Sequence, residues 1–217
     1  MSINLAILVS GRGSNMTAIL EAISQRRLDA NVAMVFANNE EAPALESAAS
    51  FSVPTAAISL IGMSREANEE KLLELLAPLA IDYVVLAGYR RVLSRRFLRE
   101  FHHEHGYYRV INIHPSLLPA FPGANGYEDA FNYGVKISGV TVHLVDEQVD
   151  HGPILAQMAF GRLPDDSLET FKTRGLQIEH KLYPAVLQNI ASNGVTYFAR
   201  LHNHKDLPAP SAGVTNQ

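Results

Sequence analysis

The stretch VINIHPSLLPAFPG, residues Val110–Gly123, joins a strand-like apolar run to a proline-rich exit and carries two polar side chains within the run. Successive side chains of a strand point to opposite faces, so Asn112 and His114 share one face. Pro115 disfavours helical backbone at His114 and keeps that residue extended at the carboxyl end of the strand. An amide and an imidazole on a core strand are costly unless they have partners. The stretch therefore predicts either a catalytic pair or a strand end with two satisfied polar groups.

The chain around this stretch alternates between strand-like and helix-like segments. The nearly continuous apolar character of residues 82–88 is typical of parallel strands that are covered on both faces. The alternation predicts an α/β fold with an open, mostly parallel twisted sheet and helices on both faces. Such sheets bind ligands beyond the carboxyl ends of their strands. The expected strands are 4–11, 31–38, 55–59, 82–88, 109–114, 139–146 and 153–161, and the expected helices are 14–26, 43–50, 64–80 (with Ser64 as N-cap), 94–103, 127–133 and 167–191.

Length and composition narrow the class of protein. The 217 residues, 47% of them hydrophobic, are enough for a single domain. We expect two halves, 1–105 and 106–192, followed by a polar tail, 193–217. A net charge of −4 without a basic block disfavours a nucleic-acid binder, and the absence of cysteine excludes disulfides and thiolate chemistry. No apolar run reaches membrane-spanning length, so we expect a cytoplasmic protein that binds no membrane.

A glycine-rich turn, SGRGSN at Ser10–Asn15, lies between the first expected strand and the first expected helix. The N–H groups of Gly13, Ser14 and Asn15 open the helix and, with its dipole, form an anion site. Position 16 is methionine, so the third glycine of the dinucleotide fingerprint is missing, as is the Gly-Lys-Ser/Thr of a nucleotide P-loop. The turn therefore predicts a phosphate monoester as ligand. The alternative is a plain tight turn without a ligand.

Acidic residues occur between the last two expected strands, in the segment VDEQVDHGP. A carboxylate beside His114 would favour the imidazolium and orient the ring. Asp146, Glu147 and Asp150 are all candidates, and their spacing does not choose among them.

Two further groups of histidines leave alternatives open. The segment FHHEH, residues 101–105, invites a zinc interpretation, but it matches neither the helical two-histidine zinc motif nor its inverted form. A solvated helix end is the better interpretation, and no metal is expected. His143 alternates with apolar neighbours in an expected strand, and it faces either the ligand crevice or a satisfied core position.

Several motifs occur in an order that resembles the phosphoribosylglycinamide formyltransferase family. The Asn-x-His-Pro-Ser-x-Leu-Pro segment with the later Asp-x-Gly-Pro is specific for folate-dependent formyltransferases. The resemblance extends from about residue 4 to about residue 190. The motifs are SGRGSN (10–15), SRE (64–66), VVLAGYRRVLS (84–94), NIHPSLLPAFPG (112–123), GVTVHLVDEQVDHGPILAQ (139–157) and IEHKLYPAVL (178–187).

The resemblance implies a Rossmann-like formyltransferase fold and a one-carbon transfer in purine biosynthesis. The formyl group would pass from 10-formyltetrahydrofolate, as co-substrate and without a metal, to the amine of glycinamide ribonucleotide. The phosphate-binding half would be 1–105, and 106–192 would carry the catalytic residues and the folate cleft. We expect a monomer or a homodimer. The implied residues are Asn112, His114 and Asp150 for catalysis, Gly13, Ser14, Asn15 and Glu179 for the ribonucleotide, and Arg65, Arg91, Val92 and Leu93 for the folate.

Three positions depart from the family's pattern. Leu176 stands three residues before Glu179, where relatives often have Lys or Gln, so a polar substrate contact is missing that Arg174 or Gln177 would have to replace. Tyr127 stands where some relatives have histidine, and it is assigned no role. Arg90 stands where a methionine can line the folate pocket.

Other functions remain alternatives. Formyltetrahydrofolate hydrolase has a similar catalytic half and uses water as the acceptor, and the GAN tripeptide at 123–125 is similar to its sequence. The hydrolase family, however, has an additional N-terminal regulatory domain before that half. Methionyl-tRNA formyltransferase is similar through the Asn-x-His segment and adds a C-terminal nucleic-acid-binding domain. A non-catalytic phosphate- or nucleotide-binding module would need only the glycine-rich turn.

Overall fold

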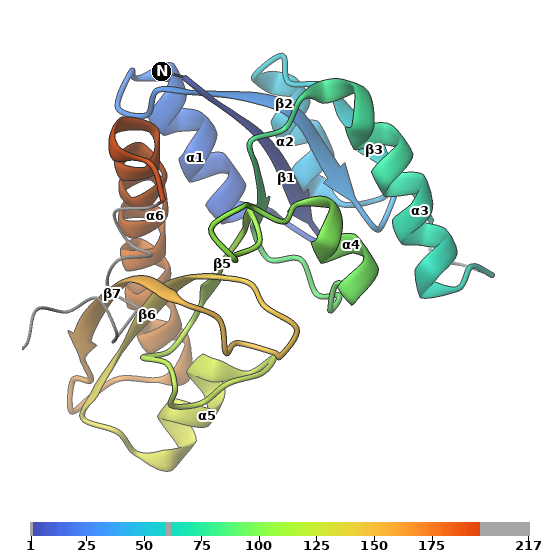
Figure 1. The fold of residues 1–217 in the computed structure, drawn as a ribbon. Helices are drawn as coiled ribbons and strands as arrows, with labels where there is room; N and C mark the ends of the chain where they lie inside the picture. Colours follow the sequence, from blue (N-terminus) through green and yellow to red (C-terminus); the bar gives the residue numbers. More distant parts are fainter. Residues whose placement is uncertain (1, 60–61, 196–217) are drawn as a thin grey trace, which may run out of the picture.

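The computed structural model describes residues 2–59 and 62–195. Within them, helices cover both faces of one central sheet (Figure 1). The expected strands and helices are all present in the expected order. The strands are β1 (Ile3–Val9), β2 (Ala30–Ala37), β3 (Thr55–Ala57), β4 (Tyr83–Leu86), β5 (Val110–His114), β6 (Ile137–Leu144) and β7 (Ile154–Gly161). The helices are α1 (Ser14–Ser24), α2 (Pro43–Ser50), α3 (Arg65–Leu76), the 3-10 helix η1 (Ala77–Leu79), α4 (Arg95–Glu100), α5 (Gly126–Tyr133) and α6 (Leu168–Asn193).

The sheet has the strand order β3-β2-β1-β4-β5-β6-β7. Strands β1 to β5 are parallel, β6 runs antiparallel to β5, and β7 runs antiparallel to β6. The predicted mostly parallel sheet is confirmed. Because the order runs outward in both directions from β1 and β4, their carboxyl ends mark the point where such sheets form a ligand crevice.

Alternation along the strands separates two apolar layers. In β1, Leu5 and Ile7 pack in the layer with α1 and α6, whereas Ala6 and Leu8 pack in the layer with α3 and α4. In β5 the isoleucines join the first layer, so Asn112 and His114 project toward the other side. Both faces are covered, as Figure 1 shows and as the apolar strands predicted.

The long helix α6 is fixed to the sheet by a buried tyrosine. The Tyr183 hydroxyl lies 3.1 Å from the carbonyl oxygen of Leu86, at the carboxyl end of β4, and 2.9 Å from that of Ile111, within β5. Burial raises the pKa of Tyr183, with a smaller contribution from the charge of Glu179 and against the effect of the Leu86 carbonyl, so the hydroxyl stays protonated. Glu179, one helical turn earlier, is thereby held near the same edge of the sheet.

Most helix boundaries have a local cause. Ser64 caps α3 by accepting from the Ala67 N–H at 3.1 Å, as predicted. The helix expected over 64–80 nevertheless ends at Leu76 and continues only as η1, because Pro78 lacks an N–H and disrupts the ladder. Helix α1 ends at Ser24, two residues earlier than expected, and α6 extends to Asn193. Residues 196–217 of the predicted tail lie outside the described residues.

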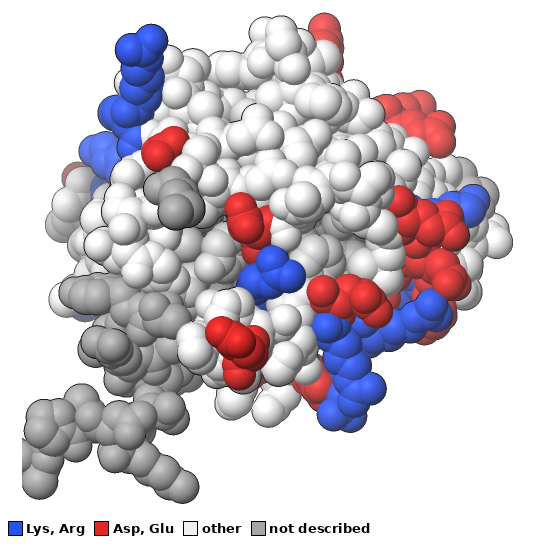
Figure 2. All heavy atoms as spheres, turned by 45° about the horizontal axis from the view of Figure 1, so that its top comes forward, with Lys and Arg blue, Asp and Glu red and all other residues white. Residues whose placement is uncertain are grey.

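Charge is distributed rather than concentrated. On the face in Figure 2, acidic and basic side chains are interspersed along the right-hand edge, where Figure 1 shows α3, and much of the rest is uncharged. Two ion pairs from α4 fit this pattern, Arg96 with Glu70 and Arg95 with Glu147. Among the described helices, none combines the length and the apolar character needed to cross a membrane.

Candidate active site

His114 lies at the carboxyl end of β5 with both ring nitrogens facing acceptors. Its Nδ1 is 3.2 Å from Asp150 Oδ2, and its Nε2 is 2.7 Å from the carbonyl oxygen of Phe121. The side chains of His114 and Asp150 are both buried. A carbonyl and a carboxylate only accept hydrogen bonds, so a ring that carries a proton on each nitrogen satisfies both contacts. The geometry therefore suits an imidazolium.

Asp150 reaches His114 from the loop between β6 and β7. Its backbone is left-handed, with φ 52°, a conformation that aspartate tolerates better than most residues. Its Oδ2 also accepts the Gly123 N–H at 2.7 Å. The carboxylate thus joins the end of β5 to the proline-rich loop.

The alternatives to Asp150 are engaged elsewhere. Asp146 pairs with His151 at 2.7 Å. Glu147 pairs with Arg95 at 2.6 Å and accepts from the Tyr108 hydroxyl at 3.1 Å. The structure thus makes the choice among the three acids that their spacing left open.

His143 contacts Asn112 on the neighbouring strand. Its Nδ1 is 2.8 Å from the Leu144 carbonyl oxygen and must be the donor there, which leaves Nε2 as an acceptor for the Asn112 amide N–H at 3.2 Å. Burial lowers the pKa of His143, against the opposing effects of the Leu144 carbonyl and Asp150, and keeps the ring neutral. The second Asn112 N–H can then donate to a ligand. Sequence reasoning left His143 undecided between crevice and core; it is a buried residue that contacts the site.

The glycine-rich turn opens α1 without a side-chain cap. Gly13 is the N-cap residue, with φ 69°, and a Cβ there would lie 2.7 Å from Ala44 Cβ. Only glycine fits both the left-handed backbone and this close approach. The first N–H groups of α1 therefore remain available to an anion. Ser14 and His180 line an adjacent hollow of about 370 Å³.

Glu179 connects α6 to this turn. It is 5% exposed, and its carboxylate accepts from Asn15 Nδ2 at 2.5 Å and from the Tyr127 hydroxyl at 2.6 Å. Burial raises the pKa of Glu179, while the bonds from Tyr127 and Asn15 act in the opposite direction. Asn15 Oδ1 is buried without a hydrogen-bond partner among the described residues, as expected of a group that awaits a ligand.

Among the predicted folate residues, Arg65 contacts Glu69, a residue that sequence reasoning missed. Glu69 Oε1 lies 3.4 Å from Arg65 Nε and accepts the Ser94 N–H at 2.8 Å, and its other oxygen accepts from the Ser94 hydroxyl. Arg65 is thereby held beside the residue that follows Leu93. Val92 is 54% exposed and Arg91 is exposed, whereas Leu93 packs in the core.

Several other residues lie apart from these contacts. Arg174, considered as a replacement for the missing contact at Leu176, forms a two-bond pair with Asp166 at 2.6 and 2.7 Å, so that replacement is not available in this structure. Gln177 is exposed. The His103 ring stacks on Tyr107 at a centroid distance of 4.6 Å, and the described residues contain no group of three or more His, Cys, Asp or Glu that could hold a metal.

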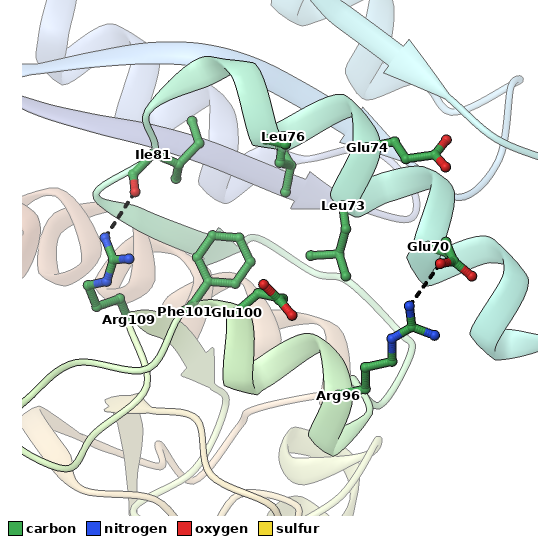
Figure 3. Close-up of a pocket in the computed structure, with 10 residues that line it drawn as sticks. Glu70, Leu73, Glu74, Leu76, Ile81, Arg96, Glu100, Phe101 and Arg109 are labelled. Atoms are coloured by element: carbon green, nitrogen blue, oxygen red, sulfur yellow. Dashed lines mark hydrogen bonds and ion pairs between the residues drawn. The ribbon is translucent and has the colours of Figure 1, made fainter.

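A hollow of about 440 Å³ lies between α3 and α4 (Figure 3). Arg109 donates to the Ile81 carbonyl at one end and Arg96 pairs with Glu70 at the other. None of the ten described residues that line it is a predicted site residue. We therefore place the candidate active site at the carboxyl ends of the strands.

The fold and the site define a formyl transferase: the family of that name matches residues 3–187, and the chain belongs to it. The chain is similar to the phosphoribosylglycinamide formyltransferase of Bacillus subtilis, with 38% identity over 186 residues, 85% of this chain and 93% of that protein. The Mycobacterium tuberculosis enzyme of the same name is 41% identical over 197 residues, 90% of this chain and 88% of that protein. The predicted family is confirmed.

Solved structures of formyltransferases have the same fold as this chain. Glycinamide ribonucleotide transformylase 1 of Symbiobacterium toebii superposes with a TM-score of 0.83 at 38% identity, covering 88% of each chain. Phosphoribosylglycinamide formyltransferase of Brucella melitensis has a TM-score of 0.81 at 40% identity, covering 89% of this chain and 97% of that one.

Proposed function

We propose that this protein transfers a formyl group from 10-formyltetrahydrofolate to the amine of glycinamide ribonucleotide, in purine biosynthesis in the cytoplasm. Membership of the formyl transferase family and the names of its relatives support formyl transfer to this acceptor. The observation that carries the chemistry is a group of contacts at β5. His114 contacts Asp150 there, and Asn112 contacts His143, whose Nε2 lies 3.7 Å from the other oxygen of Asp150.

In the proposed mechanism, the glycinamide nitrogen attacks the formyl carbon and negative charge develops on the formyl oxygen. Asn112 donates its free N–H to that oxygen. His114 Nε2, which faces the Phe121 carbonyl in this structure, turns its N–H to the formyl oxygen when the folate is bound. Losing one such donor typically costs about 10²–10³ in turnover.

Asp150 maintains the charge on His114 and assists the proton transfer. A bond forms between the amine nitrogen and the formyl carbon, and the bond from that carbon to N10 of the folate breaks. The proton lost by the amine is the one that N10 gains, so the products are formylglycinamide ribonucleotide and tetrahydrofolate. A positioned acid–base group contributes about 10²–10⁴ to such a step.

The substrates occupy two sides of this centre. The substrate phosphate binds the N–H groups of Gly13, Ser14 and Asn15, and Glu179 accepts from the ribose hydroxyls. Arg65 and the segment Arg91, Val92 and Leu93 contact the folate. In this assignment residues 1–105 supply the phosphate-binding half and 106–192 the catalytic half of one domain.

One assay separates this proposal from its alternatives. The protein is incubated with 10-formyltetrahydrofolate, with and without glycinamide ribonucleotide, and tetrahydrofolate release is measured. Release only with the ribonucleotide supports the proposal. Release without it supports the hydrolase, and binding of the ribonucleotide without release supports a non-catalytic module.

The catalytic assignment has its own test. Asn112→Ala and His114→Ala should each lower kcat by about 10²–10³ and change KM for the ribonucleotide far less. His105→Ala, which removes an exposed histidine, is the matched control and should leave both constants unchanged. A rise in KM alone in the two variants would contradict the assignment.

A further inference from the structure

Tyr127 is a buried residue of α5 that the sequence comparison left without a role. Its ring packs with Phe160 and Phe171 at centroid distances of 6.4 and 6.2 Å, the second in an edge-on arrangement. Its hydroxyl donates to Glu179 Oε1 at 2.6 Å. The aromatic neighbours immobilise the ring, so the hydroxyl is held in one place.

Helix α6 has a gap that matches this ring. A Cβ at Gly175 would lie 2.4 Å from the ring and hydroxyl atoms of Tyr127, so no larger residue fits there without displacing the tyrosine. Gly175 lies one helical turn before Glu179, on the same side of the helix. Glycine in a helix interior costs stability, and here it provides the space through which Tyr127 reaches the carboxylate.

The same end of α5 also contacts the catalytic histidine. A Cβ at Gly126 would lie 3.1 Å from His114 Nε2 and 3.0 Å from the Pro115 carbonyl oxygen. The first turn of α5 therefore packs against the imidazole through residue 126 and against Glu179 through residue 127. These two adjacent residues link the catalytic centre to the carboxylate.

The linkage continues to the phosphate turn. The second oxygen of Glu179 accepts from Asn15, the third residue of the proposed phosphate site. Glu179 is thus held by one donor from each side, and each donor is itself fixed, Asn15 in the first turn of α1 and Tyr127 in its aromatic cluster. Removing either donor leaves a buried carboxylate oxygen without its partner.

We propose that Tyr127 is a positioning residue for substrate selection: its hydroxyl orients the Glu179 carboxylate toward the ribose hydroxyls and sets its distance from His114. This inference rests on the proposed function. Tyr127 acts through Glu179, so it governs how well the ribose is held and not the bond-forming step.

The direct test is Tyr127→Phe, which deletes one oxygen and keeps the ring. We expect KM for glycinamide ribonucleotide to rise about 10–100-fold, as for loss of a hydrogen bond to a charged group, and kcat to change less than about threefold. KM for the folate should not change. Tyr133→Phe is the matched control, because Tyr133 lies on the same helix and is 80% exposed.

Two further measurements separate positioning from general packing. The first uses a ribonucleotide analogue in which hydrogen replaces both ribose hydroxyls: wild type should bind it weakly, and Tyr127→Phe should bind it no more weakly. The second is the pH profile of KM. The tyrosine bond opposes the burial that raises the pKa of Glu179, so in the variant KM should begin to increase at a higher pH on acidification.

Gly175→Ala provides an independent route to the same displacement. It should raise KM for the ribonucleotide without removing any polar atom. An unchanged KM in Tyr127→Phe, or an equal loss of affinity for substrate and analogue, would overturn the inference. If wild type itself fails to formylate the ribonucleotide, the proposed function fails instead, and the two failures are distinguishable.

Discussion

His114 Nδ1 lies 3.2 Å from Asp150 Oδ2, although the two residues are 36 positions apart along the chain. The contact depends on the left-handed backbone of Asp150, which brings its side chain back to the end of β5. Asparagine adopts this conformation as readily as aspartate. A substitution at this position can therefore remove the charge without disturbing the loop.

Asp150→Asn should lower kcat by about 10²–10⁴ while KM for the ribonucleotide changes little, because the amide no longer supports the imidazolium or the proton transfer. Steady-state kinetics at several pH values measures both constants. Asp146→Asn is the control in the same loop, since Asp146 contacts His151 and not His114. Equal losses in the two variants would mean that the loop, and not the Asp150 carboxylate, matters.

His143 is predicted to act on Asn112 as an acceptor. His143→Leu removes the acceptor and should lower kcat about 10-fold, the effect of one hydrogen bond, because the Asn112 amide is then free to rotate. His143→Gln keeps an acceptor oxygen and should retain most of the activity. If kcat in His143→Gln falls as far as in His143→Leu, orientation of Asn112 is not the role of this residue.

Gly13→Ala tests the phosphate turn. An alanine there must adopt a left-handed backbone and place Cβ against Ala44, so the free energy of unfolding should fall by about 1–3 kcal/mol. KM for the ribonucleotide should rise at least about 10-fold because the N–H groups move. Gly11→Ala is the control, since a Cβ there meets nothing within 4 Å. Comparable effects of both variants on KM and thermal unfolding would refute the prediction.

The Asp166–Arg174 pair predicts a pH dependence of stability. Hydrogen bonds from Arg174, aided by Leu163 N–H and Thr170, hold the pKa of Asp166 well below its ordinary range. The stabilisation is therefore present above the unfolded-state value of about 3.9 and is lost as pH falls through the lower folded-state pKa. Asp166→Asn should unfold at a lower temperature than wild type at pH 7, and the difference should shrink below about pH 4. A difference that does not vary with pH would argue against the ion pair.

Much of the fold was predictable because its causes are local. The apolar run of β5, the N-cap Ser64 and the turn at Gly13 each depend on neighbours within a few residues. The direction of β6 and β7 was not predictable in this way. Residues in antiparallel and parallel strands alternate alike, and direction depends on the path of the connecting loop.

The candidate site was likewise predictable only in part. Its polar residues on β5 were recognisable because an amide and an imidazole are exceptional on a buried strand. The partners of these residues were not, because Asn112 meets His143 through strand pairing and Glu179 meets Tyr127 across 52 positions.

The sequence by itself determined where most of the strands and helices lie, that a glycine-rich turn joins the first strand to the first helix, and to which family the chain belongs. Each of these follows from side-chain periodicity, backbone preferences or motif order, and none requires distant contacts. Only the tertiary structure decided that Asp150 and not Asp146 meets His114, that His143 contacts Asn112, and that Tyr127 reaches Glu179. These outcomes depend on how separate segments pack, because hydrogen-bond partners and burial exist only after distant residues come together.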